Sequence, residues 1–389
     1  NHEVTLYFRP LAGRDIEQFY SDPRYGEFWI GPRPTLAEIE TEFGVRCKDL
    51  AELEVAVTKN AGNQALGGLQ IRLVRNVDLN IDALVDTSRY NTGVDLEQAD
   101  LTDGALTEAL SAARLVKDSQ EIENLRRSVA HTVEGFENVI RSLPRAVNHR
   151  RGERVIEGAF FAKAREEGND LGYDTIAACG NNATILHWIS NTGTVENGKL
   201  VLLDAGVEDD TLYTADITRT FPVNGKFTEV QAKAYCAVLE AADAAFEVAV
   251  PGNRFRDVHA AAMKVLAQRL EEWGLLPVSA EVALSGEGGQ HRRWMPHGTS
   301  HHLGLDVHDC AQAKKELYLD GIIEPGMVFT IEPGLYFKEE DLAIPEELRG
   351  IGIRLEDDVL ITQDGNENLS AALPRTVEEI EAWMAQLTD

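Results

Sequence analysis

Four of the chain's ten histidines lie in one short stretch between Met295 and Asp309. They are His297, His301, His302 and His308. Imidazole is the commonest protein metal ligand and also carries protons near neutral pH. The stretch therefore predicts a metal site or proton-transfer chemistry. The alternative interpretation is a polar loop beside a short buried strand over residues 303–307, and this stretch taken alone favours neither.

Four carboxylates interrupt apolar segments elsewhere in the chain. They are Asp204, Asp216, Glu332 and Glu356. Brought together, they would repel one another, and some would stay protonated at pH 7. Two divalent cations would remove that conflict, and an oxygen-rich set with one nitrogen, His301, suits Mn²⁺. Two ions about 3.5–4 Å apart would lower the pKa of a shared water and give a hydroxide nucleophile. The alternative interpretation is that these five residues do not form a site and are unrelated polar residues of an acidic protein.

Two expected strands explain how the aspartates could meet. Residues 199–206 have the pattern of a buried strand that ends at Asp204, and residues 211–221 that of a returning strand. Antiparallel pairing of these strands could bring Asp216 close to Asp204. A carboxylate at the end of a buried strand needs a partner, either an arginine or a cation.

Two later strands carry the glutamates. Residues 326–334 place Glu332 inside an apolar strand that ends at a Pro-Gly pair. Residues 350–358 place Arg354 and Glu356 two positions apart, so both side chains share one face of the sheet. A further strand is expected over residues 184–188, where a lone histidine, His187, is more often structural than catalytic.

Helical periodicity predicts two pairs of long helices. They cover residues from about 122 to Pro144, 152–167, 229–248 and 255–273. The charged residues of the second helix are interpreted as a solvated face. Helix, helix and strands thus occur twice, over 113–221 and 229–362. We infer two similar halves that face each other with a site between them.

The first part of the chain differs in composition and carries no chemical motif. Residues 1–112 mix strand-like runs, such as 53–58 and 71–74, with short helices and breaks. They predict a smaller α/β domain, followed by a catalytic domain over 113–389. The chain starts at Asn1 with a strand pattern already under way, so we expect that domain to lack its beginning.

The charge balance excludes some partners. The formal net charge is −28, which argues against nucleic acid and anionic membranes because both attract basic surfaces. No apolar run reaches the ~18 residues of a membrane span. The four cysteines are scattered and form no paired motif, which is typical of a cytoplasmic protein and argues against a zinc–thiolate site.

Six segments together resemble the "pita-bread" metallopeptidases, and most of all the aminopeptidase P (Xaa-Pro aminopeptidase) family. The resemblance covers the chain from about residue 113 to its end. The segments are LDAG (203–206), ADITRTFP (215–222), HGTSH (297–301), GLDVHD (304–309), TIEPG (330–334) and GIRLE (352–356). The resemblance implies an α+β fold with two pseudo-symmetric halves around a strongly curved, mainly antiparallel sheet.

The resemblance also implies a role for each matching residue. The implied metal ligands are Asp204, Asp216, His301, Glu332 and Glu356, the same five that the charge argument collects. Glu332 would also accept a proton from a bridging water. The three further histidines, which would hold the substrate and stabilise the tetrahedral intermediate or leaving group, are His187, His297 and His308. Arg354 would pair with the acidic cluster, and His302 would lie outside it or be neutral.

The family activity would be hydrolysis of the N-terminal Xaa-Pro bond of peptides by a metal-bridging hydroxide, in a homodimer or homotetramer. Prolidase, which cleaves Xaa-Pro dipeptides with the same metal set, is the main alternative. Methionine aminopeptidase fits less well because it lacks a comparable first domain, and creatinase because it lacks the metal ligands. A non-enzymatic binding protein of this fold would have lost some of the five ligands.

Overall fold

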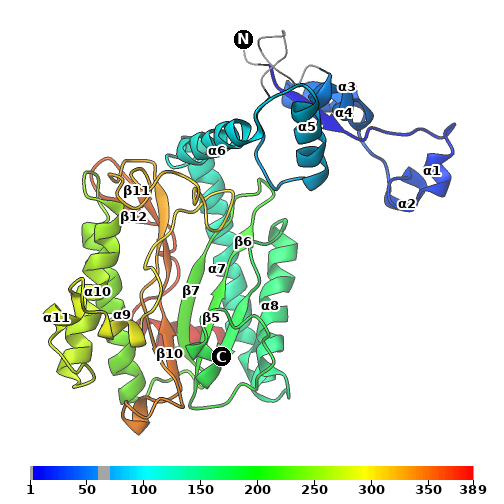
Figure 1. The fold of residues 1–389 in the computed structure, drawn as a ribbon. Helices are drawn as coiled ribbons and strands as arrows, with labels where there is room; N and C mark the ends of the chain where they lie inside the picture. The colour runs from blue at the N-terminus through cyan, green and yellow to red at the C-terminus, as the bar shows by residue number, and fades with distance from the viewer. Residues whose placement is uncertain (1–2, 60–70, 389) are drawn as a thin grey trace. The chain divides into compact units, whose positions relative to one another are not determined.

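The computed structural model describes residues 3–59 and 71–388, and the chain divides into two compact units, Asn1–Glu108 and Ala109–Asp389 (Figure 1). Helix α6 (Leu96–Ala113) crosses this division. The boundary expected at 112/113 falls at the end of that helix.

The first unit is built from short elements around one small sheet. Strand β1 (Thr5–Phe8) pairs in parallel with β2 (Arg46–Asp49). The described helices that lie wholly within this unit are α1 (Gln18–Ser21), α2 (Glu27–Ile30), α3 (Leu36–Phe43), the 3₁₀ turn η1 (Leu50–Glu52), α4 (Leu53–Thr58) and α5 (Leu79–Asn91). The strands expected over 53–58 and 71–74 are both wrong, since the first is helix α4 and the second is neither helix nor strand. The Asp49 side chain accepts a hydrogen bond from Ala51 N at 2.9 Å, and the helical turn that this cap starts continues into α4.

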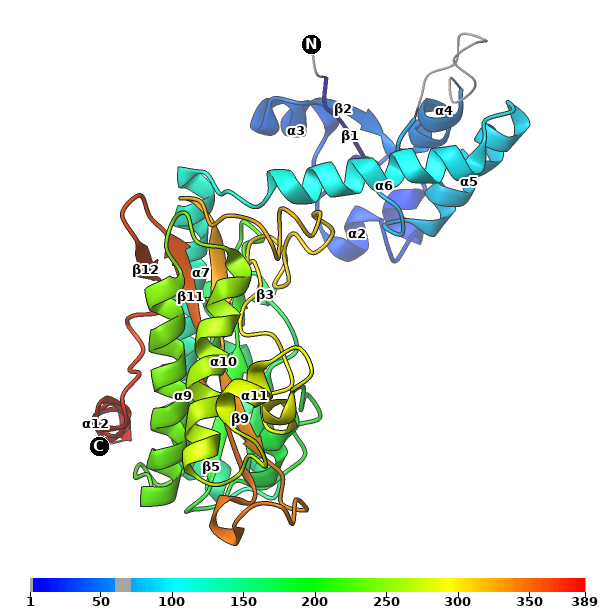
Figure 2. The ribbon, with the colours of Figure 1, turned by 60° about the vertical axis from the view of Figure 1, so that its left-hand side comes forward.

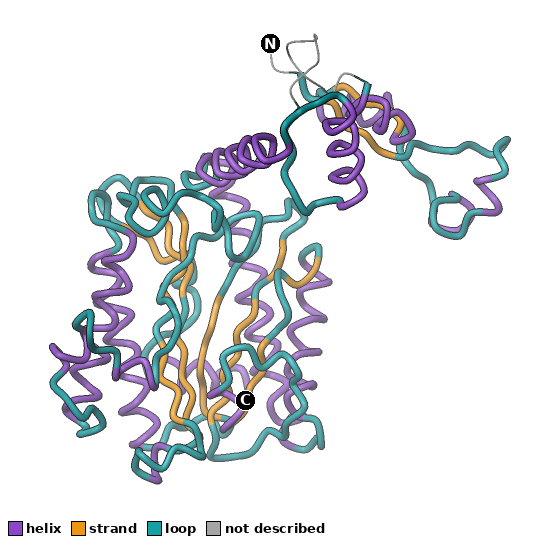
Figure 3. The backbone as a smooth tube through the Cα atoms, viewed as in Figure 1, coloured by secondary structure: helices purple, strands orange, loops and turns teal. Residues whose placement is uncertain are grey.

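The second unit has strands in the middle and long helices on both flanks (Figures 1 and 3). One flank is α7 (Ser119–Val147) packed on α8 (Gly152–Glu167), and the other is α9 (Glu229–Val248) packed on α10 (Phe255–Glu272). Figure 2 shows α9 and α10 side by side in a second view. The unit also contains α11 (Ala280–Leu284), α12 (Val377–Thr388) and the 3₁₀ turns η3 (Gly180–Thr184), η4 (Gln290–Arg293) and η5 (Glu346–Leu348).

The strands of this unit pair antiparallel, as expected. One sheet has the order β4 (Ile176–Cys179), β5 (Leu200–Ala205), β7 (Ile217–Pro222), and another the order β12 (Asn366–Asn368), β11 (Asp357–Ile361), β8 (Val328–Ile331). Two further pairs join β9 (Gly334–Phe337) with β10 (Ile351–Arg354), and β3 (Asp170–Leu171) with β6 (Val207–Glu208). A bridge between Thr218 and Glu356 links β7 to the chain just before β11, so strands from both halves meet at this point.

One helix boundary and one strand differ from the expectation. The first long helix continues through Pro144 to Val147. Proline removes only one hydrogen-bond donor, so the helix can continue for a few residues beyond it. The Pro144 carbonyl, close to the helix end, accepts from Asn148 Nδ2 at 2.8 Å. The segment 184–188 is no strand: after η3 it runs as a loop.

Phe160 on α8 offers a test of the core. Its side chain is fully buried and meets Phe136 edge to face, with 6.0 Å between ring centroids. We expect Phe160→Ala to lower the free energy of unfolding by about 3–5 kcal/mol, the usual loss for a buried phenylalanine. Phe161→Ala is the matched control because that neighbouring side chain is exposed. Urea denaturation of both variants measures the difference, and equal losses would contradict this packing.

Candidate metal centre and active site

One cavity of about 650 Å³ in the second unit is lined by every residue that the sequence predicts for the site. These residues are His187, Asp204, Asp216, His297, His301, His308, Glu332, Arg354 and Glu356. His302, from the same histidine-rich stretch, is not among the lining residues. Its buried ring instead stacks on Phe255, with 4.7 Å between ring centroids.

Strand register brings the two aspartates together. Asp204 near the end of β5 is opposite Thr218 on β7, and Asp216 immediately precedes β7. The Tyr173 hydroxyl lies 2.6 Å from Asp204 Oδ1 and 2.5 Å from Asp216 Oδ1. A hydroxyl has a single proton to donate, so it can donate to only one of these two carboxylate oxygens at a time.

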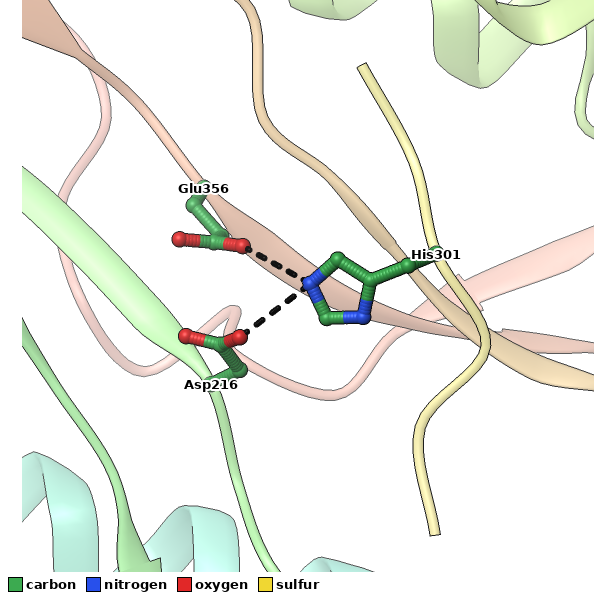
Figure 4. Close-up of side chains that lie close together, drawn as sticks. All are labelled: Asp216, His301 and Glu356. Carbon is green, nitrogen blue, oxygen red and sulfur yellow. Dashed lines mark ion pairs between the residues drawn. The ribbon is translucent and has the colours of Figure 1, made fainter. Parts of the chain in front are cut away.

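Asp216, His301 and Glu356 form a compact group (Figure 4). His301 Nε2 is 3.2 Å from Asp216 Oδ2 and 3.9 Å from Glu356 Oε1. Glu332 Oε1 is 3.8 Å from the same nitrogen. His301 Nδ1 lies 3.2 Å from the His302 carbonyl oxygen, which only a protonated Nδ1 can satisfy. This contact leaves Nε2 directed at the carboxylates, as is usual for metal-binding histidines.

Arg354 connects the remaining aspartate to the group. Its guanidinium donates to Asp204 Oδ2, to Thr218 Oγ1 at 3.2 Å and to the Tyr336 hydroxyl at 3.1 Å. Thr218 Oγ1 in turn donates to Glu356 Oε2 at 2.7 Å. The expectation that Arg354 shares a face with Glu356 is met, since both side chains contact Thr218.

The electrostatics of the group favour a cation. Burial raises the pKa of Asp204 and of Glu356, and raises that of Glu332 to about 7. Burial alone would lower the pKa of His301, but its hydrogen bond to Asp216 and the nearby carboxylate charges raise it to about 9. Proton uptake by these groups balances negative charge that divalent cations would otherwise neutralise. The donor set, four carboxylates and one imidazole, therefore fits such ions.

His297 is held in one tautomer. Its Nδ1 lies 2.6 Å from the Gly298 carbonyl oxygen, so Nδ1 carries the proton. Nε2 therefore accepts from the Tyr336 hydroxyl at 2.7 Å, and that hydroxyl accepts from Arg354. Burial and the Arg354 charge lower the pKa of His297 to about 3. His297 is thus a neutral imidazole with its Nδ1–H 3.5 Å from Glu332 Oε2.

The other two histidines come from loops. His308 meets the ring of His301 edge to face at 4.4 Å, and burial together with the His301 charge lowers its pKa. His187 follows η3 in the loop between β4 and β5. The sequence reasoning missed Tyr173, Thr218 and Tyr336. Thr218 is two positions after Asp216, so strand alternation alone places both side chains on one face, but nothing in the local pattern marks the two tyrosines.

Comparisons with known proteins identify the family of the chain. The model of the metallopeptidase family M24 matches residues 123–363. The chain is 48% identical to Xaa-Pro aminopeptidase 1 of Streptomyces coelicolor over 386 residues, which is 99% of this chain and 74% of that protein. It is 40% identical to the Xaa-Pro aminopeptidase of Escherichia coli over 280 residues, 70% of this chain and 59% of that protein.

Solved structures give the same result for the fold. Aminopeptidase P from E. coli in its low-pH form matches with a TM-score of 0.79 at 31% identity, over 98% of this chain and 82% of that chain. Aminopeptidase PepP of Pseudomonas aeruginosa matches with a TM-score of 0.80 at 29% identity, over 98% and 83%.

The fold and the matches define the class of protein: the chain belongs to metallopeptidase family M24. Within this family its similarity is to the Xaa-Pro aminopeptidases, over nearly its whole length. The predicted pita-bread fold and the prediction of a metal-dependent aminopeptidase are confirmed.

Proposed function

We propose that the protein removes the first residue from peptides that have proline in second position, using two Mn²⁺ ions. One observation carries the proposal. All the residues matching the aminopeptidase P pattern line a single cavity, in a chain 48% identical to Xaa-Pro aminopeptidases over 99% of its length. The catalytic domain is residues 113–389 in this proposal.

The metal ligands in this proposal are Asp204, Asp216, His301, Glu332 and Glu356. When bound, the ions would lower the pKa of water and polarise the scissile carbonyl. The Arg354 guanidinium holds Asp204 on one side, and Thr218 holds Glu356 on another. Both contacts hold carboxylate oxygens of residues that line the cavity.

The protein's own groups supply the proton transfers. Glu332 faces the cavity, with one oxygen near His301 and the other near His297, and is the base that accepts the proton of the attacking water. His297 presents a neutral imidazole whose Nδ1–H can turn from the Gly298 carbonyl to a developing oxyanion. His308 and His187 line the cavity as further donors to the substrate.

A paired-substrate assay tests the activity. With Mn²⁺ present, we expect cleavage of the first bond of an Xaa-Pro-Xaa tripeptide with a kcat/KM at least about tenfold above that for the matching Xaa-Pro dipeptide, a difference of about 1.4 kcal/mol in transition-state binding. Release of the first amino acid is followed by chromatography, with an Xaa-Ala-Xaa tripeptide as the control for proline.

The other outcomes identify the alternatives. Preference for the dipeptide would make the protein a prolidase. Equal cleavage of the alanine peptide would remove the requirement for proline. A protein that cleaves nothing and binds no stoichiometric ion would be a binding protein of this fold.

We also propose that the protein is cytoplasmic and forms a homodimer or homotetramer. All four cysteines are free, which is typical of proteins from a reducing compartment. No helix in the described ranges 3–59 and 71–388 is long and apolar enough to cross a membrane. The oligomer rests on resemblance to the family alone.

A further inference from the structure

Glu153, in the first turn of α8, is a buried carboxylate outside the metal centre. Its side chain is fully shielded from solvent. The interpretation of the charged residues of this helix as a solvated face is therefore wrong for Glu153. A carboxylate is costly to bury without hydrogen-bond partners, so its surroundings must supply them.

Four donors surround this carboxylate, and all come from one loop segment, residues 179–193. Oε1 accepts from Cys179 N and from Asn182 Nδ2, each at 2.8 Å. Oε2 accepts from Trp188 Nε1 at 2.8 Å and from Gly193 N at 2.5 Å. Backbone amides and an indole only donate, so this segment requires an acceptor with two oxygens and no proton, and the N-terminus of α8 favours its negative charge.

The contact between α8 and the segment is close as well as polar. The Glu153 amide donates back to the Gly193 carbonyl at 3.2 Å. A Cβ built on Gly193 would lie 2.7 Å from the Glu153 carboxylate and 2.6 Å from Asn182 Nδ2. A side chain at this position would therefore push the carboxylate off its donors.

The same segment forms one wall of the active-site cavity. Leu186, His187 and Ile189 line the cavity, and they lie between the donors at 182 and 193. After η3 the segment contains no helix or strand that would fix its path. The Glu153 carboxylate thus accepts hydrogen bonds from both ends and from the middle of the segment.

We propose that Glu153 is a positioning residue that sets the place of His187 and of the apolar wall formed by Leu186 and Ile189. It touches neither the metal ligands nor the substrate, and it acts through the loop. The role in catalysis rests on the proposed function, whereas the role in ordering the loop does not. Displacement of a catalytic group by about 1 Å costs roughly 100-fold in rate.

The test is Glu153→Gln, which keeps the shape but turns one acceptor oxygen into a donor that faces two N–H groups. We expect kcat/KM to fall about 10- to 100-fold, with bound Mn²⁺ unchanged because the metal ligands lie elsewhere. Hydrogen–deuterium exchange should rise in peptides covering 179–193 and stay unchanged in those covering 200–222. Glu166→Gln, an exposed glutamate on the same helix, is the matched control and should behave as wild type.

A double-mutant cycle separates positioning from general damage. In a His187→Ala background, Glu153→Gln should cost clearly less than in wild type, since the group it positions is gone. Full additivity, or wild-type exchange and activity in Glu153→Gln, would overturn the proposal. If Glu153→Gln does not fold, Trp188→Phe removes a single donor. It should raise exchange in the same peptides and lower kcat/KM by a smaller factor, and no change in either would also overturn it.

The activity assay and the exchange experiment together distinguish a failure of this proposal from a failure of the proposed function. If the wild-type protein cleaves no Xaa-Pro peptide, the proposed function fails, and the exchange experiment still decides whether Glu153 orders the loop. If wild type is active and Glu153→Gln is equally active with an ordered loop, only the positioning role is lost.

Discussion

Glu332→Gln is expected to lower kcat by about 100- to 10,000-fold, the range usually attributed to a general base. Glutamine keeps the shape of the side chain and one oxygen that can act as a ligand, but it accepts no proton. Glu332 is placed between His301 and His297, and no other carboxylate contacts both histidines in the described part of the chain. The measurement is steady-state hydrolysis of an Xaa-Pro-Xaa tripeptide in Mn²⁺, with metal content determined on the same sample.

Two comparisons make this result specific. Glu324→Gln changes an exposed glutamate a few residues away and should leave kcat within about twofold, as surface substitutions usually do. A variant with normal metal content and lost turnover assigns the proton transfer to Glu332. Near-normal turnover would remove Glu332 from the role of base, and loss of metal together with turnover would make it chiefly a ligand.

The arrangement of the candidate metal ligands could be predicted because regular strands connect or contain them, and strand pairing allows few arrangements. Asp204 ends an apolar strand and Asp216 starts the next, so antiparallel pairing leaves little freedom in their separation. Arg354 and Glu356 are two residues apart, and strand alternation puts them on one face. Side-chain positions can be predicted in this way where the residues lie on the same strand or on two strands that pair.

The parts that sequence reasoning missed depend on contacts between distant segments. His187 was expected on a strand, yet it lies in a loop whose path is fixed by Glu153, 34 positions earlier in the chain. Tyr173 and Tyr336 contact the site, although neither lies within one of the six segments that carry the resemblance. A single sequence shows that Glu153 is charged and helical, but its burial follows only from the tertiary packing.

Removing the metal is expected to abolish hydrolysis and also to destabilise the protein. In the metal-free site, burial and the charges of neighbouring carboxylates raise the pKa of Asp204, Glu332 and Glu356, so a bound cation would relieve an unfavourable concentration of negative charge. An ion that binds only the native state at 100 times its Kd adds about 2.7 kcal/mol to the free energy of unfolding for each site. Chelated protein should therefore melt at a lower temperature than the Mn²⁺-loaded protein and regain both properties on readdition.

A pair of aspartate variants connects this stabilisation to the site. Asp216 belongs to the group whose ligand atoms lie within 4.8 Å of one another, so Asp216→Asn should abolish most of the Mn²⁺-dependent rise in melting temperature and the activity together. Asp210→Asn alters an exposed aspartate in the adjoining turn and should retain both. Scanning calorimetry with and without chelator measures the shift. The expected stabilisation arises because bound Mn²⁺ offsets the repulsion among buried carboxylates in the native state. A melting temperature that is independent of Mn²⁺ in active wild-type protein would therefore contradict a site built from these carboxylates.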